Sequence, residues 1–172
     1  MIFKIKRHIE IDTEYQGINL TEFSFTITDE FNNDLLVDNF IRSKHFSYDC
    51  LRDSIKKQSA TGFLGQAFDI GRINIKDFKK YNKQQTTKFL IDFLNEPDWA
   101  DDKNDFATLL EQYFEIQDKL ENEYYYILSK DWFDKNDNRV FEPQNFCYIY
   151  YFLIIYIDRV SKTLILTEWT YD

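Results

Sequence analysis

The chain is poor in the residues that build cross-linked, metal-binding or linker-rich proteins. Its 172 residues include two cysteines, two histidines, two prolines and four glycines. Two cysteines, Cys50 and Cys147, are too few for a disulfide framework, and a zinc site needs several His or Cys ligands at regular spacing. So little proline and glycine disfavours long flexible linkers. We therefore expect one domain over residues 1–172, without a metal ion.

Long apolar runs and targeting signals are also absent. The most apolar run, residues 146–157, is 12 residues long, whereas a membrane-spanning helix needs about 20. Residues 1–6 lack the apolar block of a signal peptide. Together with the low cysteine count, these absences predict a cytoplasmic protein that does not bind a membrane.

The sequence contains no pattern of a catalytic or cofactor site. A Gly-x-Ser-x-Gly turn is missing, and Cys50 has no triad-like context around it. Residues 134–138 look like the start of a calcium loop, but Arg139 stands where that loop needs glycine and Asn145 where it needs glutamate, so we predict a β-turn. Residues 62–65 lack the Lys-Ser/Thr pair of a phosphate-binding loop. We expect no catalytic residue and no cofactor.

What the chain has in excess is negative charge, concentrated in one segment. Residues 92–123 hold eleven acidic residues against two basic ones, a net charge of −9, whereas residues 1–91 carry +2 and residues 124–172 carry −2. The acidic residues are Asp92, Glu96, Asp98, Asp101, Asp102, Asp105, Glu111, Glu115, Asp118, Glu121 and Glu123. Nucleic acids and anionic membranes reward clustered Lys and Arg instead. Such a negative field steers a cationic partner in from solution.

Alternation at the N-terminus predicts a β-hairpin. In residues 2–11, four apolar side chains (Phe3, Ile5, Ile9 and Ile11) alternate with polar ones, and only Arg7 interrupts the apolar face. Residues 20–28 repeat the pattern, and residues 14–19 connect the two strands. This period of two is typical of half-buried strands.

Helical spacing dominates the middle of the chain. We predict helices over residues 47–58 and 83–95, a short extended piece at 72–75, and a third helix that Asp101 or Asp102 caps. The apolar face of the third helix is formed by Phe106, Leu109, Leu110, Tyr113, Ile116, Gln117 and Leu120. Glu111, Glu115 and Asp118 lie nearly opposite that face and should be exposed, with Lys119 pairing with Glu115.

Three strands are predicted at the C-terminal end, over residues 124–133, 146–157 and 162–171. The continuous apolar run of the second is typical of a central strand buried on both faces. We therefore expect burial of Tyr148, Phe152, Ile154 and Leu166. Strands, then helices, then strands predict an α+β fold, in which a mostly antiparallel sheet of the N-terminal hairpin and three C-terminal strands packs against three or so helices.

Two interpretations of the acidic segment remain open, a solvated helix face and a docking surface for a partner. Trp99 lies nearby, and the C-terminal strand ends in aromatic residues expected to be at least partly exposed; aromatic side chains are typical interface anchors. The candidate partner-binding residues are Asp98, Trp99, Asp101, Asp102, Glu111, Glu115, Asp118, Trp169 and Tyr171.

A basic stretch lies directly before the acidic segment. Its charged residues are Arg72, Lys76, Lys79, Lys80, Lys83 and Lys88 against Asp77, a net charge of +5. Compensation between the two neighbouring segments and nucleic-acid binding by the basic stretch are the two explanations, and the acidic total favours compensation.

A small, acidic, cytoplasmic α+β protein with a biased surface resembles in general character the immunity proteins of bacterial toxin systems. The resemblance covers overall character rather than a motif. It implies binding to a cognate toxin domain, often a basic nuclease, and a block of its active site or substrate surface. The alternative is a phage or mobile-element anti-defence protein that acts as a partial nucleic-acid mimic, although the +2 of residues 1–91 speaks against complete mimicry. An enzyme of unrecognised type is a third class, and the oligomeric state is not indicated.

Overall fold

The protein is built around one six-stranded antiparallel sheet. The computed structural model describes residues 1–27, 31–46, 63–64, 68–69, 72–96, 102–120, 124–129 and 150–171. The sheet consists of β1 (Ile2–Asp12), β2 (Gln16–Thr26), β8 (Thr163–Tyr171), β7 (Tyr150–Asp158), β6 (Tyr124–Ser129) and β5 (Lys79–Tyr81), in that spatial order. The hairpin, the three C-terminal strands and their antiparallel pairing confirm the predicted α+β fold; β5 is an added short edge strand.

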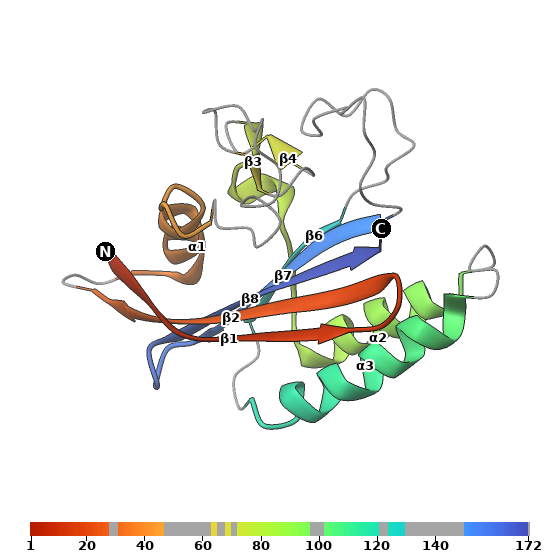
Figure 1. The fold of residues 1–172 in the computed structure, drawn as a ribbon. Coiled ribbons are helices and arrows are strands. Elements are labelled where there is room, and N and C mark those ends of the chain that lie inside the picture. The colour runs from red at the N-terminus through yellow and green to blue at the C-terminus, as the bar shows by residue number, and fades with distance from the viewer. Residues whose placement is uncertain are drawn as a thin grey trace.

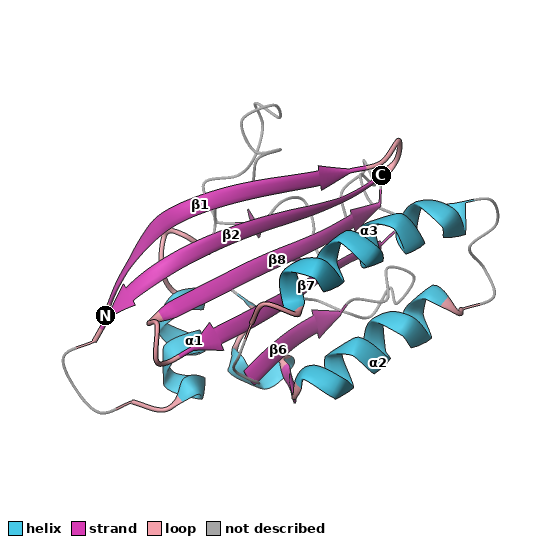
Figure 2. Cartoon of the chain, turned by 90° about the horizontal axis from the view of Figure 1, so that it is seen from below, coloured by secondary structure: helices cyan, strands magenta, loops and turns pink. Residues whose placement is uncertain are grey.

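Helices lie on both faces of the sheet (Figure 1). They are α1 (Asn33–Ile41), the 3₁₀ helix η3 (Ile75–Asp77), α2 (Lys83–Leu94) and α3 (Lys103–Gln117), and a two-stranded ribbon pairs β3 (Phe63–Leu64) with β4 (Phe68–Asp69). Figure 1 shows α2 and α3 side by side on one face and α1 on the other. In Figure 2 the β1–β2 hairpin extends beyond the layer formed by α2 and α3.

The core contains an aromatic cluster where the two central strands, β7 and β8, meet α2 and α3. Phe152, Ile154 and Leu166 are buried as predicted, whereas Tyr148 lies outside the described residues. Phe152 stacks on Trp169 of the neighbouring strand, with ring centroids 5.4 Å apart and planes inclined by 14°. The resulting aromatic layer supports both α2 and α3.

A β-bulge changes the face of the first strand halfway along it. The pairing of β1 with β2 shifts between Ile5 and Arg7, which makes Lys6 an extra residue. Before the bulge, Phe3 packs against Phe40 of α1, with ring centroids 5.1 Å apart. After it, Ile9 lies on the opposite face, beside α3. The predicted single apolar face is therefore wrong, because one inserted residue reverses every later side chain.

The predicted helices are only partly correct. The α2 helix matches the prediction, and Asn82 begins it with a capping box. The α1 helix was not predicted, because a polar stretch precedes its nine residues; Asn32 caps it. Residues 72–75 are not a strand, since η3 begins at Ile75 and the strand follows it at residue 79. The helix predicted over 47–58 and the turn over 134–138 lie outside the described residues.

Candidate functional site

The outer face of α3 carries exposed acidic side chains, as its periodicity predicted. Glu111, Glu115 and Asp118, which we term the acidic ridge, are exposed, while the opposite side of the helix is buried. Asp118 forms an ion pair with Lys83 of α2 at 3.2 Å. Within the described part of the chain, Glu111 and Glu115 have no ion-pair partner. The predicted pairing of Lys119 with Glu115 is not among the ion pairs of the described residues, and Lys119 lines a pocket.

The aromatic core positions the acidic ridge. Phe106 and Tyr113 project from the inner face of α3 and contact the indole of Trp169, with ring centroids 5.4 and 5.0 Å apart. Their burial fixes the rotation of the helix about its axis. Phe114 is partly buried against the core and follows Glu111 at i+3, the spacing of neighbours on a helix surface. Phe114 therefore adds an aromatic side chain beside the ridge.

The exposure predicted for Trp169 is wrong. This residue is fully buried, because β8 is a central strand: Trp169 lies between Ile18 of β2 and Phe152 of β7 and is covered by α3. It presents no surface to a partner in this structure. Tyr171, two residues further along, is half-buried.

Tyr171 belongs to a polar network that attaches the start of α3 to the end of the sheet. Its hydroxyl donates to the Asp102 carboxylate, and the hydrogen bond and charge of Asp102, together with burial, raise the Tyr171 pKa to about 12. Gln16 donates to the Asp102 carbonyl at 2.8 Å and accepts from the buried Tyr150 hydroxyl at 2.8 Å. Asp102 stands at the helix start, but its side chain does not cap the helix as predicted, since Tyr171 occupies its carboxylate.

Two groups of residues remain: the other candidate partner-binding residues and the lysines of the basic stretch. Asp98, Trp99 and Asp101 lie outside the described residues. In the basic stretch, three lysines are paired with acidic side chains at 2.7–3.2 Å: Lys80 with Asp34, Lys83 with Asp118, and Lys88 with Asp92. Compensation by the neighbouring acidic segment is thus observed for two of the six basic residues, Lys83 and Lys88, whereas Lys80 pairs with α1.

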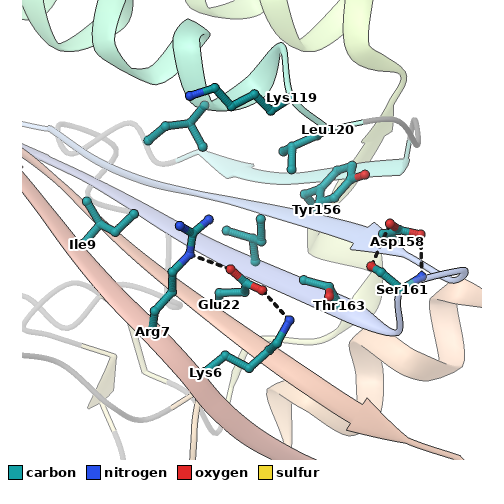
Figure 3. A pocket seen from close by; sticks show the side chains of 12 residues that line it. Lys6, Arg7, Ile9, Glu22, Lys119, Leu120, Tyr156, Asp158, Ser161 and Thr163 are labelled. Carbon is teal, nitrogen blue, oxygen red and sulfur yellow. Dashed lines mark hydrogen bonds and ion pairs between the residues drawn. The ribbon is translucent and has the colours of Figure 1, made fainter.

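An open pocket of about 340 Å³ lies at the C-terminal end of α3, over the β1–β2 hairpin (Figure 3). Its apolar lining consists of Ile9, Ile116, Leu120, Tyr156 and Ile165, and its charged lining of Lys6, Arg7, Lys119, Glu22 and Asp158. The basic residues come from the bulge in β1 and from the end of α3. This pocket was not predicted from the sequence; its one local signal is Arg7, which interrupts the apolar alternation.

Glu22 joins the basic side chains of the bulge. Its carboxylate accepts from Lys6 Nζ at 2.7 Å and from Arg7 Nε at 2.6 Å, and its side chain is 13% exposed. Burial alone would raise the Glu22 pKa, but the hydrogen bonds and charges of Lys6 and Arg7 outweigh burial and hold the pKa below its ordinary value. The carboxylate therefore stays ionised at neutral pH.

Comparisons with known proteins add no relative: neither a family model, nor a curated protein, nor a solved structure matches this chain.

No group of three or more His, Cys, Asp or Glu side chains suited to a metal ion occurs among the described residues. His8 hydrogen-bonds Thr21 at 2.8 Å and Glu10 at 3.1 Å. None of the helices in the described part is long and apolar enough to cross a membrane. The absence of catalytic activity stays a prediction.

Proposed function

We propose that this protein is an immunity or inhibitor protein, which binds a basic bacterial toxin domain and neutralises it by covering its active site or substrate surface. The observation that carries the proposal is the uncompensated negative charge on α3. Glu111 and Glu115 are exposed, lie one helical turn apart and have no ion-pair partner among the described residues.

In α1 and in α2, two side chains of opposite charge spaced i,i+4 form an ion pair, unlike Glu111 and Glu115 of α3. An i,i+4 ion pair joins Asp38 to Arg42 at the end of α1 and Lys88 to Asp92 in α2. On α3 the same spacing holds two like charges, which destabilise a helix by about 0.2–0.5 kcal/mol. The arrangement does not help the helix, and a basic partner would relieve its repulsion.

Charged and aromatic side chains have separate roles in this proposal. Complementary charge raises the association rate and rejects partners of the wrong sign. Much of the affinity of an interface comes from a few aromatic anchors, and Phe114 at the side of the ridge is the described residue best placed for that role. The undescribed Trp99 remains a second predicted anchor.

Neutralisation of a toxin in bacterial cells tests the proposal. Candidate basic toxin domains are taken from the genes next to this chain's gene, and each is expressed alone, with the wild-type protein, and with the double variant Glu111→Gln/Glu115→Gln. The control is Glu10→Gln/Glu14→Gln, which removes the same charge from exposed sites on and beside β1. We expect growth with the wild type and the control, and weaker growth with the α3 variant. Toxicity that the wild type does not relieve contradicts the proposed function.

A further inference from the structure

The pocket at the end of α3 is divided into parts of different chemistry. The basic side chains of Arg7 and Lys119 lie toward one end, Ile9, Ile165 and Leu120 provide apolar walls, and Asp158 lies at the other end (Figure 3). The Asp158 carboxylate already accepts from the backbone N–H and the hydroxyl of Ser161 in the β7–β8 turn. Its charge is thereby committed to the turn, whereas the basic end is open.

Arg7 has unused donors at that basic end. A guanidinium has five N–H donors, and among the described contacts of Arg7 only Nε is bonded, to Glu22 at 2.6 Å. The two Nη groups have no partner among the described residues, and Figure 3 shows the end of the side chain directed toward α3. Glu22 thus fixes the orientation of the guanidinium and leaves the Nη groups available to a second anion. Lys119, on the facing wall, also has no ion-pair partner in the part of the chain that the structure describes.

The charge balance selects the kind of anion. Among the described residues, three basic and two acidic residues line the pocket, a net charge of +1, which a monoanion neutralises. A phosphate dianion would leave excess negative charge close to Glu22. The five apolar or aromatic lining residues exclude a ligand that is polar throughout, and a volume of about 340 Å³ is within the usual range for small-molecule pockets.

We propose that this pocket binds a small organic monocarboxylic acid with an apolar body, whose carboxylate lies against Arg7 and Lys119 and whose body covers Ile9, Ile165 and Leu120. A planar guanidinium suits a carboxylate because it can donate two parallel hydrogen bonds. The inference is independent of the toxin-binding proposal, since it uses no residue of the acidic ridge.

The test uses the full-length protein and 4-phenylbutyrate as the probe, followed by NMR titration. Matched ligands are 4-phenylbutan-1-ol, 4-phenylbutylamine and phenyl phosphate. We expect a Kd of roughly millimolar for a ligand of this size. We also expect at least about tenfold weaker binding of the alcohol, because charged hydrogen bonds are lost, and no binding of the amine. Signals of Ile9, Leu120 and Ile165 should shift.

Single substitutions locate the site. Arg7→Gln should weaken binding of 4-phenylbutyrate about tenfold, while Lys6 still pairs with Glu22. Lys88→Gln on α2, which removes one positive charge outside the pocket, should leave the Kd unchanged, as should Glu111→Gln/Glu115→Gln. Circular dichroism verifies the fold of each variant. Equal affinity for acid and alcohol, tighter binding of phenyl phosphate, an equal loss in Lys88→Gln, or no binding at 10 mM probe (a concentration about tenfold above the expected Kd) each overturns the inference.

Discussion

The acidic side chains on the outer face of α3 and in the pocket at its C-terminal end differ in exposure and in ion pairing. Glu111 and Glu115 are exposed and unpaired among the described residues, whereas Glu22, 13% exposed, is held by two basic side chains. Water solvates an exposed carboxylate at little cost, but a carboxylate withdrawn from water needs hydrogen bonds and opposite charge. The pairing of Glu22 therefore serves the fold, while the charges on α3 remain available to a partner.

Both regions depend on the same aromatic support, and removing it should have the largest effect. Phe152 is buried against Trp169, Phe89 and Phe93. Phe152→Ala should lower the free energy of unfolding by about 3–5 kcal/mol, measured by chemical denaturation. The partly exposed Phe114 is the control, and Phe114→Ala should cost clearly less. A loss below about 1 kcal/mol for Phe152→Ala would show that this layer does not support the helices.

Removing the charge of Glu22 tests the paired side of the comparison. Glu22→Gln should lower the free energy of unfolding by about 1 kcal/mol, a value kept small because Lys6 and Arg7 are largely exposed to solvent. Denaturant titration of both proteins at pH 7 gives the difference. An increase in stability would mean that the two basic side chains do not depend on Glu22.

The stability difference between the wild type and Glu22→Gln should depend on pH, because the ion pairs of Glu22 require its ionised carboxylate. Because the folded-state pKa of Glu22 is lowered from 4.5, its contribution is fully present above that value and is lost as pH falls through the folded pKa. The wild type should therefore lose its advantage over Glu22→Gln on acidification below about pH 4. Unfolding measured from pH 7 to pH 3 follows the loss. A difference that stays constant over that range contradicts the assignment.

Removing the charge of Glu115, which has no ion-pair partner among the described residues, should raise the free energy of unfolding slightly. Glu115→Gln relieves repulsion with Glu111, so the free energy of unfolding should rise by about 0.2–0.5 kcal/mol. The control Asp92→Asn removes a charge paired with Lys88 and should not stabilise. Thermal unfolding at low salt measures both variants, and destabilisation by Glu115→Gln would indicate that this side chain has a structural role.

Local patterns in the sequence predicted what is local in the structure. The helices α2 and α3 and the outward phase of Glu111 follow from periodicity within one segment. The reversal of β1 at Lys6 does not, because a bulge depends on pairing with another strand. Burial of Trp169 depends on β8 lying between β2 and β7, which the alternation of one strand cannot reveal. The pocket was missed for the same reason, since it joins residues of β1, β2, β7, β8 and α3.

Association kinetics across a salt series test the central claim most directly. A toxin domain that the wild type neutralises is mixed with the wild type, with Glu111→Gln/Glu115→Gln and with Glu10→Gln/Glu14→Gln, from about 0.01 M to 1 M salt, over which the screening length falls from about 30 to 3 Å. We predict an association rate at low salt about tenfold lower for the α3 variant than for the wild type and the control, with a shallower decline as salt increases. Equal rates for all three proteins at every salt concentration would contradict docking on the acidic ridge.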